Sequence, residues 1–374
     1  METIGAKFEI PGRFVEAVPY GSGHIHDTYL ARYEDSARIA RFILQRINSE
    51  VFRDPLALMD NLSRICAHQL RALTREGVPD PERRCLTLVP ARDGRPYWAD
   101  ARGDYWRCFP FQEGTRSLDR VQTEHQAHET ARAFGAFAAR LLDLDGPSLA
   151  VTIPRFHDLA HRYADLENAI RRDRNDRARA AKVEIDRAAD WFDTLERDFR
   201  KFGGPSLPVR IFHNDCKINN VLLDADSGEG LCVIDLDTVM DGTVLCDFGE
   251  LVRTSTCRSV EDEIQLDAIS FELDLLRGVA RGYLTGAGAF LAPAELRVLP
   301  IAGMVMAFEN AIRFLTDHLC GDVYFKIHRA GQNLDRSRTQ LRLVELMDEN
   351  RDAIRAVLTT AQDEILDDSG PPPR

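Results

Sequence analysis

The segment His213-Asn-Asp-Cys-Lys-Ile-Asn-Asn220 brings together residue types that could do chemistry. Asp215 follows a short apolar run, and Lys217 and Asn220 come two and five residues after it. Asp235 lies fifteen residues beyond Asn220, at the end of another apolar run. A single aspartate here could simply cap a turn, but the joint spacing is typical of a catalytic site.

Phosphoryl transfer to a hydroxyl group would use these residues. The reaction needs the hydroxyl aimed at the γ-phosphate, a carboxylate to take its proton and Mg²⁺ to neutralise phosphate charge. Asp215 could be that carboxylate, and Lys217 could reach the γ-phosphate. Asn220 and Asp235 offer the hard oxygen ligands that Mg²⁺ prefers. In a pleated strand, Asp235 and Asp237 would point to the same side, with Asp237 farther from the phosphates. We therefore expect Asp237 to face the acceptor.

The elements that must position these residues predict an α+β fold in two lobes that share one cleft. We expect an N-terminal nucleotide-binding lobe over residues 1–112, a helical C-terminal lobe over 113–366 and a flexible tail over 367–374. Apolar–polar alternation and turn residues predict strands at Val15–Tyr20, Ile25–Tyr33, Arg38–Ile47, Tyr105–Phe111, Val209–His213, Val221–Asp224 and Leu231–Leu236. One helical pattern begins at Pro55. Further helical patterns cover His125–Leu142, Arg155–Phe202, Phe271–Tyr283, Pro293–Leu319 and Asp335–Leu366. We read the charge run Arg171–Arg179 as a solvated helix face.

Composition excludes several classes of partner. The 374 residues carry a formal net charge of −12, which is poorly suited to a nucleic-acid backbone. The longest apolar run, Leu299 to Phe308, is shorter than the roughly 20 residues that span a bilayer. The eight cysteines form no CxxC pair, as expected of reduced core thiols. We therefore expect a cytoplasmic protein that binds a small molecule, with no nucleic-acid or membrane partner; nothing in the sequence predicts its oligomeric state.

Further stretches make the catalytic pattern more specific. They are Gly21-Ser-Gly-His-Ile-His-Asp-Thr-Tyr29, Ile43-Leu-Gln-Arg-Ile-Asn48, Val233-Ile-Asp-Leu-Asp-Thr-Val-Met240, Cys246-Asp-Phe-Gly249, Arg313-Phe-Leu-Thr-Asp-His-Leu319 and Gly321-Asp-Val-Tyr-Phe-Lys326. Together with the first segment, they resemble the aminoglycoside phosphotransferase superfamily, a branch of the protein-kinase-like fold. Within it, the chain resembles the N-acetylhexosamine 1-kinases over roughly residues 18 to 340.

The resemblance implies a small antiparallel-sheet lobe, a larger helical lobe, and ATP and Mg²⁺ as cofactors. The implied reaction phosphorylates the anomeric hydroxyl of N-acetylglucosamine or N-acetylgalactosamine. Asp215 would be the base, Asn220 and Asp235 the metal ligands, and Asp247 a buried brace for the catalytic loop. The sugar site would be lined by His24, Arg313 and Tyr324.

The nucleotide side departs from the protein-kinase pattern. A lysine in the third strand usually holds the phosphates, but the only lysine before residue 182 is Lys7. We therefore expect Gln45 or Arg46 to do this work. The turn glycines Gly21 and Gly23 are expected above the phosphates. At the hinge, Cys108–Gln112, backbone groups could pair with adenine, and we expect Phe109 or Phe111 to pack on the adenine ring.

Alternatives remain for the acceptor. Met240 is followed by Asp241-Gly242 rather than by proline, in a loop expected near the acceptor. The acceptor could instead be an amino-alcohol, a thiosugar or an aminoglycoside. A nucleotide-binding pseudokinase regulator is a third hypothesis, which the joint presence of Asp215, Asn220 and Asp235 disfavours.

Overall fold

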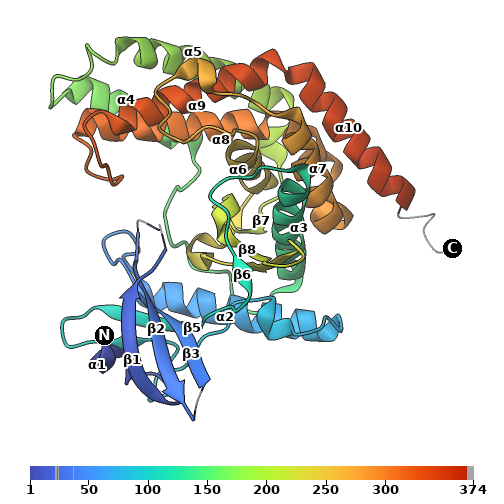
Figure 1. Ribbon diagram of the computed structural model, residues 1–374. Coiled ribbons are helices and arrows are strands. Elements are labelled where there is room, and N and C mark those ends of the chain that lie inside the picture. The colour runs from blue at the N-terminus through green and yellow to red at the C-terminus, as the bar shows by residue number, and fades with distance from the viewer. Residues whose placement is uncertain (22, 24, 37, 369–374) are drawn as a thin grey trace.

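The computed structural model describes residues 1–21, 23, 25–36 and 38–368. An antiparallel sheet and one long helix form the N-terminal lobe, and the remainder is mainly helical (Figure 1). The predicted α+β class is confirmed. The division of the chain at residue 112 stays a prediction. His24 and part of the predicted tail, residues 369–374, lie outside the described residues, and helix α10 includes Asp367 and Asp368.

The N-terminal sheet is antiparallel in the order β1-β2-β3-β5-β4. Its strands are β1 (Arg13–Pro19), β2 (Asp27–Asp35), β3 (Arg38–Arg46), β4 (Trp98–Ala99) and β5 (Tyr105–Pro110). Alternate residues of β3 face opposite sides, as the pleat requires. Phe42 and Leu44 join a small core with Phe8 from the N-terminal segment, whereas Ile43 packs on the main core of the molecule.

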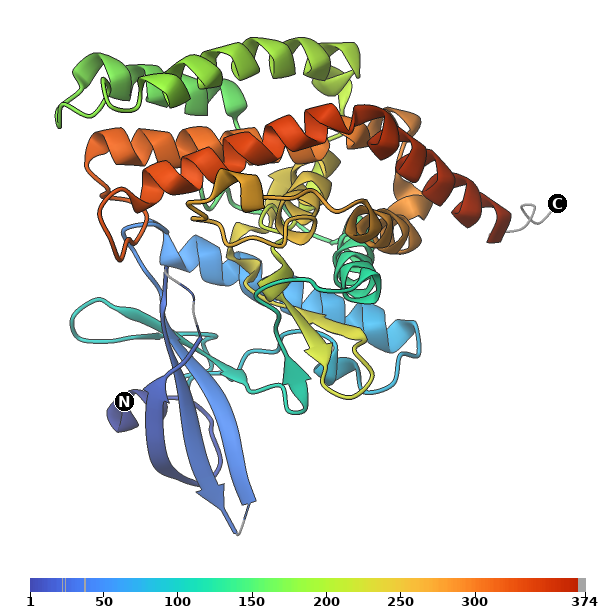
Figure 2. The ribbon, with the colours of Figure 1, turned by 45° about the horizontal axis from the view of Figure 1, so that its top comes forward.

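Helix α2 (Pro55–Arg75) lies between this sheet and the helical lobe (Figure 2). Asp54 caps it by accepting a hydrogen bond from the backbone of Ala57 at 3.0 Å, and Pro55 occupies the first turn, where no amide is needed. Leu58 and Leu62 bury the apolar face of α2 in the main core.

The second lobe is built of helices around two small sheets. Its helices are α3 (Glu124–Arg140), α4 (Leu159–Arg172), α5 (Lys182–Lys201), α6 (Val244–Ser255), α7 (Leu273–Ala287), α8 (Pro293–Cys320), α9 (Gln332–Glu349) and α10 (Arg351–Asp368). One sheet pairs β10 (Met240–Gly242) with β7 (Arg210–Phe212); the other has the order β6-β8-β9, formed by Thr115–Arg116, Val221–Asp224 and Gly230–Val233. Helix α7 approaches α3 closely: a Cβ at Gly282 would lie 2.1 Å from the carbonyl oxygen of His128.

Two predicted long helices are each divided. Arg155–Phe202 was expected to be helical throughout, but α4 ends at Asp173, whose φ of 31° is left-handed. The charge run after it lies mostly in the connection to α5, where Arg177 pairs with Asp322, so its assignment to a helix face was wrong. The second predicted helix is interrupted at Asn350, between α9 and α10.

Helix α8 is the central element of the helical lobe. Among the described residues it is the one helix long and apolar enough to cross a membrane, yet 89% of its most apolar window is buried inside the fold. That burial is typical of a core helix. All eight cysteines are free thiols; six are buried as predicted, while Cys257 is half-buried and Cys320 is exposed.

Candidate active site

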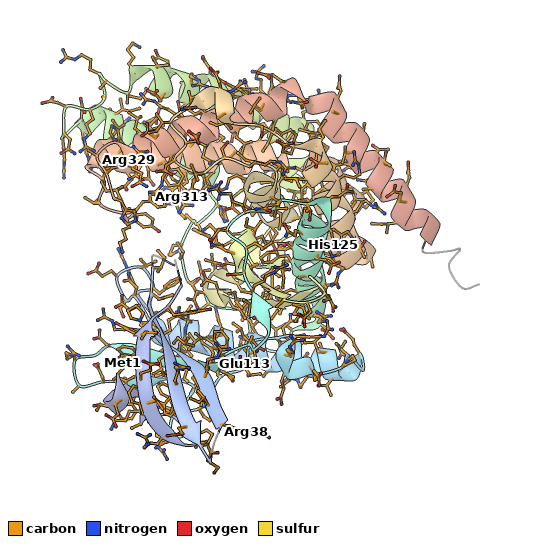
Figure 3. The ribbon with its side chains drawn as sticks, viewed as in Figure 1. Met1, Arg38, Glu113, His125, Arg313 and Arg329 are labelled. Atoms are coloured by element: carbon orange, nitrogen blue, oxygen red, sulfur yellow. The ribbon has the colours of Figure 1, made fainter. Side chains whose placement is uncertain are left out.

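A cavity of about 810 Å³ opens between the two lobes. Asp215, Asn220 and Asp235 all line it, so the three residues separated in sequence meet at one place. Arg313 of α8 and Tyr324 of the loop after α8 line the same cavity. In Figure 3, Arg313 lies on the side of the helical lobe that faces the N-terminal sheet.

The loop that carries Asp215 is held by its neighbours. Asn214 has a left-handed φ of 63°, and its side-chain amide donates hydrogen bonds to the carbonyls of Phe212, Thr238 and Met240 at 3.0–3.1 Å. The fully buried carboxylate of Asp247 accepts from the backbone of Asn214 at 2.7 Å and of His213 at 3.2 Å. The prediction that Asp247 braces this loop is confirmed.

Asp215 faces the cavity with a cation beside it. Lys217 Nζ lies 2.9 Å from Asp215 Oδ1, and Asn220 Nδ2 donates to the Asp215 carbonyl at 3.0 Å. Burial alone would raise the pKa of Asp215, but the charge and hydrogen bond of Lys217 outweigh it and lower that pKa. Asp215 is therefore an ionised hydrogen-bond acceptor that can orient a hydroxyl.

Asp235 and Asn220 are adjacent across the base of the β8–β9 hairpin, where the Ile234 amide donates to the Asn220 carbonyl at 2.9 Å. Asp235 has a left-handed φ of 60°, and none of the described residues donates a hydrogen bond to its carboxylate. Partial loss of hydration in the cavity, together with the carboxylates of Asp237 and Asp215, raises the pKa of Asp235, although the residue remains exposed. An unpartnered carboxylate near other carboxylates, in a cavity that Asn220 also lines, fits a divalent cation.

The acceptor end of the cavity combines a guanidinium with aromatic rings. The Arg313 guanidinium carbon lies 5.3 Å from the Phe156 ring and 5.6 Å from the Phe325 ring. The loop that presents Tyr324 and Phe325 is shaped by Asp317, whose carboxylate accepts three backbone hydrogen bonds, from residues 323, 324 and 325, at 2.8–2.9 Å. Arg313 and Tyr324 are thus available to a ligand that reaches Asp215.

His157, which the sequence pattern does not single out, lies between the acceptor end and the catalytic loop. Its Nδ1 is 2.8 Å from Glu309 Oε1 and its Nε2 is 2.6 Å from the Asn214 carbonyl oxygen. Both partners are acceptors, so both ring nitrogens donate and the imidazole is cationic. Burial would lower the pKa of His157, as would Arg313, but Glu309 and the two hydrogen bonds raise it overall.

This pairing predicts a pH-dependent stability. Because the folded-state pKa of His157 is raised, its contribution is fully present below about pH 6.5, the ordinary histidine pKa, and is lost as the pH rises through the folded-state value. We expect the melting temperature of wild type to fall relative to that of His157→Gln above that pH. Melting curves across the neutral and alkaline range check this, with exposed His125→Gln as the control; parallel profiles for wild type and His157→Gln would contradict it.

The structure places most of the predicted nucleotide residues away from this cavity. Gly23 lines it, whereas Gly21 stands exposed nearby on the same hairpin. Phe109 is buried in the main core, and Phe111 packs edge-on against Tyr20. Contact of these two rings with adenine stays a prediction.

Neither residue expected to replace the strand lysine has a free side chain in the cavity. Arg46 lies on the sheet face opposite Gln45 and pairs with Asp27 and Asp104, so its assignment to the phosphates was wrong. Gln45 does face the main core, but its amide donates to Thr28 and its oxygen accepts from Arg107.

Asp237 lines the cavity, but its carboxylate is already bound within the protein, so its contact with the acceptor stays a prediction. Residues 236–238 form a turn of 3₁₀ helix instead of continuing the strand, which separates the directions of Asp235 and Asp237. The Asp237 carboxylate is bound by two side chains that the sequence analysis missed, Arg107 and His26. A charged residue within the apolar strand sequence Tyr-Trp-Arg-Cys-Phe was the available signal for Arg107.

The Asp241-Gly242 step, in contrast, does not line the cavity. Both residues belong to β10, which pairs with β7, and a Cβ at Gly242 would lie 2.2 Å from Asn214 Oδ1. The residues that follow Met240 in place of proline therefore support the catalytic loop and do not contact the acceptor.

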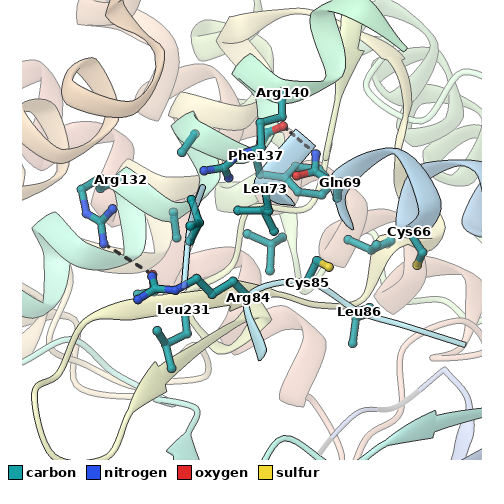
Figure 4. Close-up of a pocket in the computed structure, with 16 residues that line it drawn as sticks. Cys66, Gln69, Leu73, Arg84, Cys85, Leu86, Arg132, Phe137, Arg140 and Leu231 are labelled. Carbon is teal, nitrogen blue, oxygen red and sulfur yellow. Dashed lines mark hydrogen bonds between the residues drawn. The ribbon is translucent and has the colours of Figure 1, made fainter. Parts of the chain in front are cut away.

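A second, smaller cavity of about 160 Å³ has Leu73, Phe137 and Leu231 in its lining (Figure 4). Its walls come from α2, α3, β9, the segment 78–86 and Leu236. The side chains of its three arginines are paired with carboxylates: Arg84 with Glu229, Arg132 with Glu129, and Arg140 with Glu76. Residues 215, 220 and 235 are not part of its lining, and the larger cavity is the candidate active site.

Comparisons with known proteins agree with this geometry. The model of the phosphotransferase enzyme family (APH) matches residues 16–286, more than half of the chain and the whole of the catalytic loop. The chain belongs to this family. The phosphotransferase is also similar to solved structures of low sequence identity, among them the microcompartment-associated aminopropanol kinase (TM-score 0.57, 16% identity, covering 94% of this chain and 97% of that one).

Two further structures have the same fold as this phosphotransferase. The aminoglycoside phosphotransferase from Alicyclobacillus acidocaldarius has a TM-score of 0.57 and 14% identity, over 97% of this chain and 96% of that one. The choline kinase from Cryptosporidium parvum has a TM-score of 0.51 and 15% identity, over 92% of this chain and 93% of that one. The expected two-lobed kinase-like fold is confirmed.

Proposed function

We propose that this phosphotransferase transfers the γ-phosphate of ATP, with Mg²⁺, to the anomeric hydroxyl of an N-acetylhexosamine. The observation that carries the proposal is the meeting of Asp215, Asn220 and Asp235 in one cavity whose other end holds Arg313 and Tyr324. Mg²⁺ held by Asn220 and Asp235 would neutralise charge on the phosphates.

Asp215 has the central role in the proposed reaction. Its carboxylate orients the acceptor hydroxyl and takes the proton as the oxygen forms a bond to the γ-phosphorus. The bond from that phosphorus to the bridging oxygen breaks, and ADP leaves with the electron pair. Lys217, 2.9 Å from Asp215, is close enough to balance charge on the transferred group.

The charge balance of the acceptor end supports a neutral polar acceptor over a cationic one. The nearest carboxylate oxygen to Arg313 belongs to Glu309, at 3.8 Å, and Glu309 is already bound to His157. Asp322 pairs with Arg177, and Asp262 with Arg329. An ammonium group near Arg313 would meet Glu309, Asp322 and Asp262, which are already paired, whereas a carbonyl or hydroxyl group would meet the Arg313 donors.

The second candidate is a kinase for a small amino-alcohol. It is favoured by the names of three structural relatives, the aminopropanol and choline kinases and the ethanolamine kinase from Plasmodium vivax (TM-score 0.52, 12% identity). A protein of the same fold could bind an amino-alcohol if the residues at the acceptor end of the cavity differed.

A panel of acceptors tests the proposal. The protein is incubated with Mg-ATP and N-acetylglucosamine, N-acetylgalactosamine, the unacetylated hexoses, choline, ethanolamine or an aminoglycoside, and products are identified by ³¹P NMR. We expect a hexosamine 1-phosphate. Another phosphorylated acceptor would overturn the sugar assignment alone, and no phosphorylated product with any of them would overturn the kinase assignment.

Arg313→Met is expected to raise the KM for the acceptor by about 10- to 100-fold, because a hydrogen bond from a charged donor contributes roughly 1.5–3 kcal/mol. The KM for ATP should stay within error of wild type, since Arg313 lies at the acceptor end. Steady-state kinetics with each substrate varied check this. Arg329→Met, which removes a nearby surface arginine paired with Asp262 and Asp335, is the matched control. An unchanged acceptor KM would remove Arg313 from the acceptor site.

A further inference from the structure

Four side chains form a buried connection between the two lobes, which we call the interlobe clamp: His26, Gln45, Arg107 and Asp237. Arg107 Nη1 donates to Asp237 Oδ1 at 2.5 Å, and Nη2 donates to Oδ2 at 2.7 Å. His26 Nε2 lies 2.6 Å from Asp237 Oδ2. The side chains of Arg107 and Asp237 are only 3% and 2% exposed.

The remaining contacts fix the orientation of each partner. His26 Nδ1 accepts from the backbone of Asn48 at 3.0 Å, so Nε2 carries the proton that is donated to Asp237. Gln45 Oε1 accepts from Arg107 Nε at 2.8 Å and from Nη2 at 2.6 Å. Four N–H groups of the guanidinium are thereby used within the protein, which argues that Arg107 does not itself hold the nucleotide phosphates.

The clamp differs from the ion pair that protein kinases use in their small lobe. In protein kinases a strand lysine pairs with a glutamate on the helix of the small lobe. Here the single acid of α2, Asp60, is exposed, and it makes no ion pair with the described residues. The strand cation of this chain is instead Arg107, and its carboxylate partner belongs to the other lobe.

Asp237 is two residues from the metal-ligand candidate Asp235, within one tight turn. Well-packed apolar residues often stabilise a fold as much as a buried ion pair does, so a fully hydrogen-bonded pair at this place points to a positional role. We propose that Arg107 is a positioning residue: by holding Asp237, it fixes the Asp235 carboxylate relative to the N-terminal lobe. This inference rests on the proposed function, since it takes Asp235 as a cation ligand.

The test uses Arg107→Gln, Asp237→Asn and the double variant, with Arg32→Gln as the control. Arg32 is an exposed arginine of the same sheet, paired with Glu16 and remote from the cavity. Two measurements are made without an acceptor: hydrogen–deuterium exchange of residues 231–241 in the ligand-free protein, and Mn²⁺ affinity in the presence of ADP by electron paramagnetic resonance. We expect faster exchange of residues 231–241 in the single variants and a Mn²⁺ affinity lowered by about 10- to 100-fold, the usual effect of losing an outer partner of a metal site.

The double variant separates positioning from simple stability. It leaves no buried charge unpaired and keeps the net charge, so its melting temperature should exceed that of either single variant, while its Mn²⁺ affinity stays low. If a single variant does not fold, the Mn²⁺ affinity of the double variant tests the proposal. Recovery of Mn²⁺ affinity together with melting temperature, or unchanged exchange of residues 231–241 in Arg107→Gln, would overturn the proposal. If the wild-type protein phosphorylates no acceptor in the panel, the proposed function is overturned. The exchange and Mn²⁺ measurements need no acceptor and would still test the role of Arg107.

Discussion

Asp215→Asn is expected to lower kcat by about 10²- to 10⁴-fold, the range of contributions from a positioned proton acceptor. The amide has nearly the same shape as the carboxylate but cannot take the hydroxyl proton, and it loses the ionic contact with Lys217. Nucleotide affinity should change little, because Asn220 and Asp235 remain. The measurements are kcat with the best acceptor and ADP affinity by calorimetry.

Asp226→Asn is the control for this variant. Asp226 is an exposed carboxylate at the tip of the β8–β9 hairpin, close in sequence but outside the cavity. It should behave as wild type in both measurements. Unchanged turnover in Asp215→Asn would remove Asp215 from the role of proton acceptor.

Asp235→Asn is expected to weaken Mg²⁺-dependent ADP binding by about 100-fold, which corresponds to roughly 3 kcal/mol for the loss of a charged partner. Asparagine is a better replacement than alanine here, because Asp235 has a left-handed backbone conformation that asparagine tolerates. The variant also removes repulsion from Asp215 and Asp237, so the ligand-free protein should melt no lower than wild type.

Calorimetric titration with ADP, with and without Mg²⁺, together with melting curves, checks this expectation. Asp241→Asn, an exposed carboxylate of β10 outside the cavity, should leave ADP binding unchanged. Normal Mg²⁺-dependent affinity in Asp235→Asn would refute its assignment as a metal ligand. Weaker binding to the same extent without Mg²⁺ would do so as well.

Local patterns predicted the elements of the fold well. The alternation in Arg38–Ile47 corresponds to β3, and the apolar period after Pro55 corresponds to α2, because each pattern is written in consecutive residues. The breaks inside the long charged helices were missed. No proline or glycine marks the end of α4, where an aspartate takes the left-handed conformation instead.

The chemical residues were recognised where their spacing is short, as in Asp215 and Asn220. The nucleotide side was less accessible to such reasoning, because Arg46 and Arg107 are equally plausible cations until the strand register shows which one faces the other lobe. His157 gave no signal at all: its two partners, Glu309 and the carbonyl of Asn214, are 152 and 57 residues away in sequence.

The loop after α8 owes its shape to a side chain outside itself. Asp317 holds the backbone of residues 323–325, while the side chains of Val323 and Tyr324 stay 78% and 52% exposed at the rim of the cavity. Replacing either side chain costs little folding energy, since neither packs in the core. This rim is therefore the place where a new substrate range can evolve, or be engineered, without loss of the rigid catalytic framework.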